Sequence, residues 1–245
     1  MFGFKIWAKF GAFKDPMTIS QNITINFPPK SAVSGMLAAV LGIDDFLEDD
    51  SFGDFKYSVV SKNVAKKSFS QNYINDYTKK TNSMLINLQK LDFDKISGGL
   101  RDTNAPQKPT NRELLINPSY IIFIKDFKFE DEIISNLKNR ISRYSLYMGN
   151  SEFAANFKFI EIDKFENSNF GVIELDSFIE QSLVENIDFI DKVLYKNTLI
   201  TTKLDKNRSP INSINLIHSS DKIKAKNISA YEIKTKDKTY FCRFV

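Results

Sequence analysis

The residues best suited to chemistry in this sequence follow a pair of prolines near the amino terminus. Pro28 and Pro29 fix φ and offer no N–H donor, so a helix can begin only at about the next residue. Lys30, Ser31 and Ser34 then fall in the first helical turn, where free N–H groups and the helix dipole favour an anion such as a phosphate. Taken alone, the structural alternative is favoured: these side chains simply cap a core helix.

A second set of candidate binding residues lies in the polar, basic stretch 61–112. Residues 56–112 carry 11 Lys and Arg against 4 Asp and Glu, a net charge of +7. Lysine and arginine neutralise phosphates, and the aromatic residues interleaved with them can stack on unpaired bases. The pattern favours a nucleic acid, whereas the structural alternative is a solvated charged face. The basic side chains singled out here are Lys66, Lys67, Arg101, Lys108 and Arg112.

The charge balance changes sign along the rest of the chain. Residues 130–191 hold 5 basic and 13 acidic side chains, and residues 192–245 hold 12 basic and 4 acidic ones. Two basic regions on either side of an acidic one favour a polyanion on one surface and a protein partner on another.

The sequence contains few residues of the types that usually catalyse reactions or bind metals. His218 is the only histidine and Cys242 the only cysteine, which excludes an intrachain disulfide and a cysteine-rich zinc site. The acidic run at 44–50 is better explained as a solvated loop than as a site for a hard cation, and no nucleotide-binding glycine motif is present. We therefore expect no catalytic residue, no metal and no cofactor. One alternative stays open: a ribonuclease in which Tyr, Lys and Ser share proton transfer with His218.

Composition predicts a globular protein of the cytoplasm. The chain has 245 residues, of which 42% are hydrophobic and 26% charged, values that are ordinary for a protein with a sizeable core. It holds no apolar run long enough to span a membrane, and its first residues do not resemble a signal peptide.

Strands and helices alternate in the region that carries these residues. The order strand, helix, strand, arm, strand, helix, strand predicts an α+β fold, a ferredoxin-like βαββαβ sandwich over residues 1–165. The arm is a protruding basic hairpin inserted at about 61–112, with a strand predicted at 84–88. The remaining strands are predicted at 2–10, 57–60, 120–124 and 157–162, the helices from residue 30 and over 131–141, and a weaker extended stretch at 18–26.

Residues 166–245 are predicted to form a β-rich extension that packs on the first domain or a small second subdomain. The clearest signal there is a hairpin of 231–233 with 240–244, joined by a turn at 236–238.

Four blocks of this sequence resemble the CRISPR-associated Cas-five family. The most specific signature is the amino-terminal one, FGAFKDP at 10–16 followed by FPPKSAVSGMLAAVLG at 27–42. PTNRELLINP at 109–118 and YMGNSEFAA at 147–155 agree with the type I-B branch of that family. The blocks occur in the family's order and span residues 10–155.

The resemblance implies an RRM-like fold of the RAMP superfamily with a protruding thumb, in a non-catalytic subunit of Cascade, the type I interference complex of antiviral defence. Such a subunit binds and caps the 5′ handle of the crRNA, contacts the backbone subunit and the large PAM-recognising subunit, and meets target DNA only indirectly; no membrane is involved. The arm would be the thumb. By the same resemblance, Lys14, Lys30, Ser31 and Ser34 would lie near handle phosphates, Arg101, Lys108 and Arg112 along the thumb base, and Tyr147 and Gly149 in a loop facing a neighbouring subunit.

Two competing functions remain. The type I-C branch cleaves precursor crRNA with Tyr, Lys and His, but His218 lies between Ile217 and Ser219, so the Lys-His pair of that branch is missing. This absence argues against a metal-independent endoribonuclease. The third possibility is a protein–protein scaffold in which the basic arm is only solvated.

Overall fold

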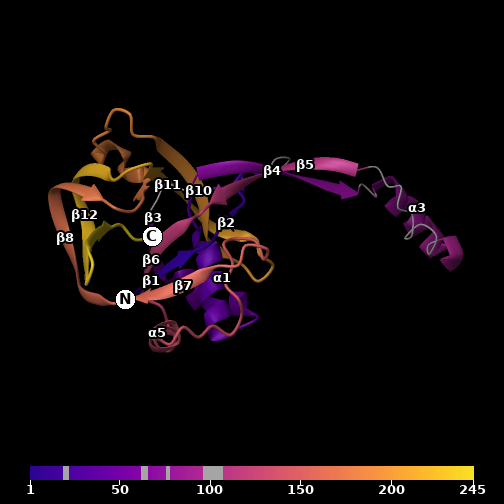
Figure 1. The fold of residues 1–245 in the computed structure, drawn as a ribbon, viewed down its shortest axis with the longest axis horizontal. Helices are drawn as coiled ribbons and strands as arrows, with labels where there is room; N and C mark the ends of the chain where they lie inside the picture. Colours follow the sequence, from indigo (N-terminus) through magenta and orange to yellow (C-terminus); the bar gives the residue numbers. More distant parts are fainter. Residues whose placement is uncertain (19–21, 62–65, 76–77, 96–106) are drawn as a thin grey trace.

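The protein combines helices with antiparallel sheets, and a long arm projects from its body (Figure 1). The computed structural model describes residues 1–18, 22–61, 66–75, 78–95 and 107–245. Within these ranges no helix is both long and apolar enough to cross a membrane.

A four-stranded sheet forms the centre of the body. Its strands lie in the order β3-β6-β1-β7, and every neighbouring pair is antiparallel. Phe4 of β1 is paired with Ile122 on one side and with Phe159 on the other. The strands are β1 (Phe2–Trp7), β3 (Lys56–Ser61), β6 (Ser119–Lys125) and β7 (Asn156–Ile160).

Two helices cover one face of this sheet. Helix α1 (Lys30–Leu41) and helix α5 (Glu130–Lys138) contact each other and bury Val33, Leu37 and Ile133 in the largest hydrophobic core. The predicted start of α1 directly after the diproline is confirmed. The helix ends at Gly42, which has a φ of 77° and whose N–H donates to the Ala38 carbonyl.

The carboxy-terminal part packs on the opposite face. Ile121 and Phe123 point away from the helices and form a second core with Ile233, Tyr240 and Cys242. This part holds two three-stranded sheets, β13-β12-β8 and β10-β11-β9. Their strands are β8 (Ile162–Leu175), β9 (Ile179–Glu180), β10 (Tyr195–Leu204), β11 (Pro210–Ser219), β12 (Ile223–Thr235) and β13 (Thr239–Cys242). The predicted hairpin is confirmed by the pairing of β12 with β13.

Short helical turns fill two connections. Turn η1 (Phe46–Glu48) and helix α2 (Ser51–Asp54) lie between α1 and β3. Turn η2 (Gln181–Asn186) separates β9 from β10.

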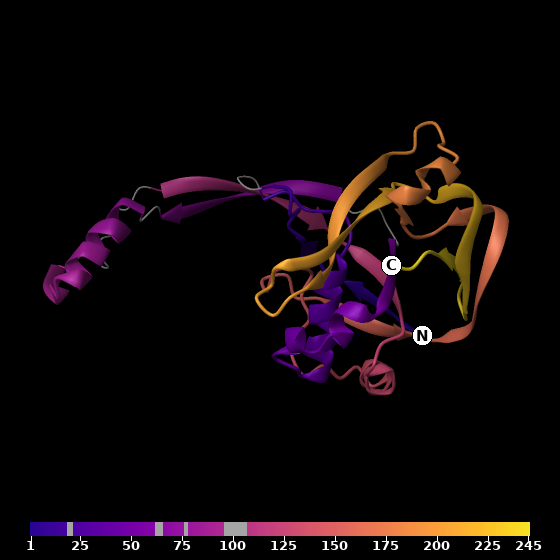
Figure 2. The ribbon, with the colours of Figure 1, turned by 180° about the vertical axis from the view of Figure 1, so that it is seen from behind.

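The arm is inserted between β3 and β6 and extends well beyond the body, as both ribbon views show (Figures 1 and 2). Strands β4 (Lys66–Asn75) and β5 (Gln107–Ile116) pair along ten residues each, and helix α3 (Thr78–Gln89) lies at the far end. At the body, β5 also pairs with β2 (Phe10–Gly11). Leu85, Ile86 and Leu88 of α3 are exposed.

Three local predictions differ from the structure. The predicted strand at 84–88 is part of helix α3, because Met84, Leu85 and Leu88 recur at helical spacing among good helix formers. The predicted strand at 2–10 ends at Trp7, and the next strand segment leaves the central sheet to pair with the arm. The predicted helix at 131–141 ends at Lys138, which leaves Ile141 exposed.

The extended stretch at 18–26 falls partly on residues 19–21, which lie outside the described residues. Within it, Asn22 and Thr24 form only isolated bridges, to Arg112 and Lys14. The described part is therefore a loop held at two points and not a regular strand.

A pair of leucine substitutions tests where the stabilising core lies. Leu37 is 1% exposed in α1, so Leu37→Ala should lower the free energy of unfolding by about 2–5 kcal/mol, because a cavity remains in the core. Leu88→Ala in α3 is the matched control, since Leu88 is 50% exposed, and it should change stability by less than about 0.5 kcal/mol. Urea denaturation measures both. Equal losses would contradict this description of the core.

Candidate nucleic-acid interface

The amino-terminal turn of α1 is used mainly for packing. Lys30 is only 5% exposed, and its ammonium lies 4.9 Å from the centre of the Phe55 ring. Burial lowers the pKa of Lys30 to about 8, although the nearby Asp54 carboxylate opposes the shift. Ser34 is buried too, and its hydroxyl lies 2.6 Å from the Phe52 carbonyl oxygen and 3.0 Å from that of Lys30. This geometry favours the structural alternative for Lys30 and Ser34.

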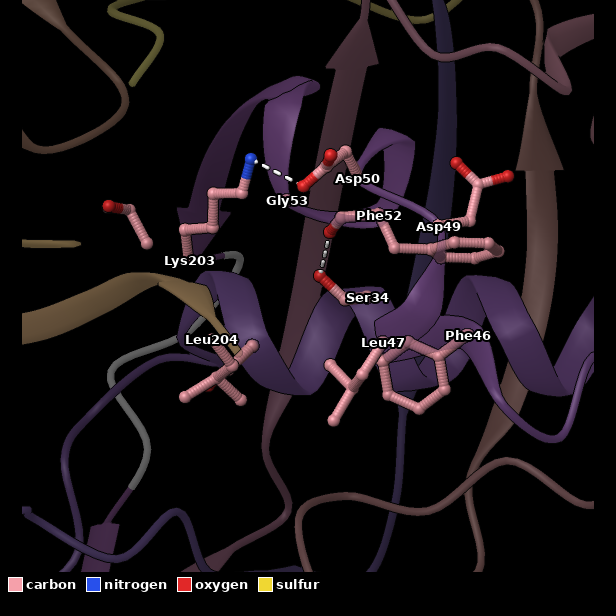
Figure 3. Close-up of a pocket in the computed structure, with 11 residues that line it drawn as sticks. Ser34, Phe46, Leu47, Asp49, Asp50, Phe52, Gly53, Lys203 and Leu204 are labelled. Carbon is pink, nitrogen blue, oxygen red and sulfur yellow. Dashed lines mark hydrogen bonds and ion pairs between the residues drawn. The ribbon is translucent and has the colours of Figure 1, made fainter. Parts of the chain in front are cut away.

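Ser31 is half-buried beside a pocket between α1, the η1–α2 turn and β10 (Figure 3). The cavity measures about 20 Å³, room for about one water molecule. On its rim Lys203 pairs with Asp50 at 2.8 Å and with Asp54 at 2.9 Å. A pocket of this size can hold no nucleotide.

The acidic run at 44–50 is partly neutralised by lysines from other elements. Besides the Lys203 pairs, Asp49 accepts a hydrogen bond from Lys128 at 2.8 Å and another from the Ser51 N–H. These bonds lower the pKa of Asp49 to about 2. Among the described residues, no three His, Cys, Asp or Glu side chains are grouped as a metal site.

A polar clamp holds the base of the arm on the body. The Lys67 ammonium donates to the Thr24 carbonyl at 2.6 Å and to the Glu113 carboxylate at 2.8 Å. The same carboxylate accepts the Thr24 N–H at 2.9 Å, and the Glu113 N–H donates to the Asn22 carbonyl at 2.8 Å. Lys67 thus joins β4, β5 and the amino-terminal loop, and its charge is already paired.

Arg112 and three neighbours form a basic and aromatic cluster beside this clamp, here called the arm-base cluster: Lys9, Phe10, Arg112 and Phe153. The Arg112 guanidinium lies 4.8 Å from the Phe153 ring centre and pairs with Glu152, whose pKa it lowers. The Phe10 and Phe153 rings are 6.4 Å apart, and the Lys9 ammonium lies 5.8 Å from the Phe10 ring.

The arm-base cluster combines exposed cation and ring surface. Lys9 and Phe10 are exposed, so a charge and an aromatic ring face solvent together. One terminal nitrogen of Arg112, Nη2, is buried without a hydrogen-bond partner in the described structure. Sequence reasoning missed Lys9 and Phe153 because only the fold brings the amino-terminal strand, β5 and the 147–155 loop together.

The other predicted RNA-binding residues are placed as follows. Lys14 is exposed, and its backbone forms an isolated bridge with Thr24 in the amino-terminal loop. The backbone of Lys66 begins β4 and that of Lys108 lies in β5, but their side chains lie outside the described residues, as does all of Arg101.

The loop with Tyr147 and Gly149 is anchored to the amino-terminal segment. The Ala12 N–H donates to the Met148 carbonyl at 3.0 Å, and the Met148 N–H donates to the Phe153 carbonyl at 2.8 Å. Gly149 has a φ of +91°, and a Cβ there would lie 1.9 Å from the Ala12 carbonyl oxygen. Gly149 is therefore required by close packing, while Tyr147 remains exposed on the same loop.

His218 is held in a neutral, structured environment. Its Nε2 lies 3.2 Å from the Thr198 hydroxyl, and its ring packs edge-on against Phe27 at 5.1 Å. Burial, assisted by the positive charges of Lys196 and Lys67, lowers the pKa of His218 to about 4. The imidazole is therefore uncharged at neutral pH.

The clamp can be tested by removing its ammonium. Lys67→Ala should lower the free energy of unfolding by about 1–3 kcal/mol, because the Glu113 carboxylate loses its cationic partner and the Thr24 carbonyl its donor. Hydrogen exchange should also speed up at the Thr24 and Glu113 amides. Lys14→Ala removes an exposed lysine of the same region and should change neither quantity. Identical behaviour of the two variants would rule out the clamp.

The close approach of Gly149 to Ala12 predicts a second effect on stability. Gly149→Ala should cost at least about 1–3 kcal/mol, since the methyl group meets the Ala12 carbonyl and φ is positive. Gly171→Ala is the control, because a Cβ there meets nothing within 4 Å. A thermal melt compares the two. A Gly149→Ala protein as stable as the parent would show that the loop does not pack in this way.

Comparison with known proteins agrees with this architecture. The sequence matches, over residues 2–207, the family described as CRISPR-associated protein (Cas_Cas5). No curated protein matches the sequence. A chain described as "CRISPR RNA-guided surveillance complex" is similar in structure, with a TM-score of 0.52, 12% identity and 91% of each chain covered.

Two further solved structures are similar at lower scores. One is a CRISPR protein from Archaeoglobus fulgidus, with a TM-score of 0.49, 14% identity and coverage of 99% of this chain and 100% of that chain. The other is a chain of the type III-B Cmr-beta bound to cognate target RNA and AMPPnP, with a TM-score of 0.49, 14% identity and coverage of 91% and 86%. Because the family match covers most of the sequence, the chain belongs to the CRISPR-associated Cas5 family.

Proposed function

We propose that this protein is a non-catalytic subunit of a type I-B Cascade complex that binds and caps the 5′ handle of the crRNA. The observation that carries the proposal is the arm-base cluster, in which a cation and an aromatic ring are exposed where a projecting arm leaves the body. Lysine and arginine bind phosphates and aromatic rings stack on unpaired bases, which are the two interactions that hold single-stranded RNA.

The sheet topology supports the finer fold assignment within this proposal. The order β3-β6-β1-β7, with one helix after β1 and one after β6, is the order of a ferredoxin-like sheet. The arm inserted between β3 and β6 would be the thumb. RNA held by the arm-base cluster would then run along the thumb and not across the sheet face that the carboxy-terminal strands cover.

Two exposed surfaces support contacts with protein partners: the arm tip and the loop of 147–155, which also carries Phe153 of the arm-base cluster. Large apolar side chains are exposed at the arm tip, including Leu85, Leu91 and Phe93, and Tyr147 is exposed on the loop of 147–155. We assign the arm tip and this loop to contacts with the backbone subunit and the large PAM-recognising subunit. Target DNA would be met through the assembled complex.

The setting of His218 supports a non-catalytic role. A general acid or base works best with a pKa near the operating pH, whereas the pKa of His218 lies at about 4. Its Nε2 shares a hydrogen bond with the Thr198 hydroxyl, and its ring packs against the Phe27 ring. The competing function is a metal-independent endoribonuclease that processes precursor crRNA. As a general acid or base in that reaction, His218 would need a pKa closer to neutral pH.

RNA binding can be tested by its salt dependence. Fluorescence anisotropy of a labelled single-stranded repeat RNA, measured with the full chain at several KCl concentrations, should give a log–log slope that becomes shallower by about one for each lost phosphate contact. Lys9→Gln and Arg112→Gln should each show this change together with weaker binding. Lys236→Gln, an exposed lysine on the β12–β13 turn, is the control and should keep the parent slope. Parent-like slopes for both cluster variants would contradict the proposal.

Cleavage is tested separately. The purified protein, incubated with its full repeat RNA without metal, should leave the RNA intact. A specific cut that disappears in His218→Ala but persists in Lys236→Gln would establish the endoribonuclease function instead.

A further inference from the structure

A cleft of about 370 Å³ lies where the central sheet meets the carboxy-terminal sheets. It is formed by the end of β3, the segment before α1, and strands β10, β11 and β13. Its volume is near the lower end of the range for small-molecule sites. In contrast with the pocket of Figure 3, this cleft has space for a single nucleotide unit.

Among the described residues that line the cleft, Lys196 is the one lysine without an ion pair; the carboxylates in the lining are Asp176 and Asp221. Lys222 and Lys238 approach Asp176 at 3.5 and 3.2 Å, and the Asp176 side chain is only 4% exposed. Asp176 also accepts the Phe241 N–H at 3.0 Å, so it anchors the rim. Lys196, on β10, has no carboxylate within ion-pair distance among the described residues. Its charge is strong enough at this site to help lower the pKa of His218, its cross-strand neighbour.

The inner wall is aromatic and amide-bearing. Phe27 packs against both Phe178 and His218, with ring centres 5.7 and 5.1 Å apart. His218 offers two hydrogen-bonding nitrogens, of which Thr198 occupies one. Asn26 lines the same cleft, and its side-chain oxygen is shielded from solvent without a hydrogen-bond partner in the described structure. A buried acceptor without a partner costs free energy, and a hydrogen bond from a ligand donor would remove that cost.

We propose that this cleft binds one nucleotide unit, with the base against Phe27, His218 and the Asn26 amide and the phosphate on Lys196. Aromatic rings can contact the face of an unpaired base, while the neutral imidazole and the amide can form hydrogen bonds with its edge. The ammonium of one unpaired lysine can bind one phosphate. The nucleotide can be a residue of a single-stranded RNA or a free mononucleotide. In the first case the inference rests on the proposed function and adds a second anchor beyond the arm-base cluster.

The test separates these sources and uses the full chain. The four 5′-mononucleotides and the matching nucleosides are titrated by calorimetry, and a single-stranded RNA with 4-thiouridine at each position in turn is photocrosslinked and mapped. At least one mononucleotide should bind, more tightly than its nucleoside. Lys196→Ala should weaken that binding by about tenfold, because a charge-assisted hydrogen bond is lost. Lys206→Ala, at the exposed turn of the same β10–β11 hairpin and outside the cleft, should leave it unchanged.

The outcomes are distinct. Crosslinks to residues 26–27 or 216–220, with RNA displacing the mononucleotide, assign the cleft to a nucleotide of RNA. Mononucleotide binding that RNA does not displace assigns it to a free nucleotide, and it stands even if the protein binds no RNA and the proposed function fails. If no mononucleotide binds and all crosslinks map to the arm, the cleft proposal is overturned while the proposed function stands.

Discussion

The burial of strand β6 on both faces is the constraint on which the rest of the structure depends. Tyr120, Ile122 and Ile124 point into the core beneath the helices, while Ile121 and Phe123 point into the core beneath the carboxy-terminal sheet. A strand that is apolar on both sides needs a covering layer on each side. Helices α1 and α5 therefore cover one face, and strands β12 and β13 cover the other.

This sandwiching also decides where function can lie. With both faces of the sheet largely occupied, exposed binding groups gather where the arm leaves the body and where the two layers meet at the edge strand β3. The first place is the arm-base cluster, fastened by Lys67 and Glu113. The second is the cleft with Lys196 and His218. Both combine cations with aromatic rings, but the arm-base cluster is an open surface and the cleft is a cavity.

The amino-acid sequence predicts the regular parts of this fold well, because their signals are local. Pro29 and Gly42 mark the two ends of α1, and the continuous apolar run at 120–124 marks the central strand. The helix at the arm tip escaped prediction because a short apolar run such as 84–88 is compatible with either a strand or a helix. The residues on either side of this run continue the helical spacing, so the whole of Thr78–Gln89 forms a helix.

The candidate site was harder to predict, because sequence does not show which way a lysine points. Lys30 lies in an anion-binding position of its helix, yet it is buried against Phe55. The ammonium of Lys67 is already ion-paired with the Glu113 carboxylate. In contrast, Lys9 and Phe153 come together only through long-range pairing. Sequence reasoning thus identified the basic region, and the structure shows that Lys67 and Arg112 are ion-paired there while Lys9 lies exposed beside them.

The central claim is that single-stranded RNA contacts the protein where the arm joins the body. Hydrogen–deuterium exchange of the full chain, with and without saturating repeat RNA, measures this most directly. We predict slower exchange on RNA binding in residues 9–14 and 110–116, the segments that carry Lys9, Phe10 and Arg112 of the arm-base cluster. RNA binding that leaves exchange in both segments unchanged, with protection only on other surfaces, would contradict the account.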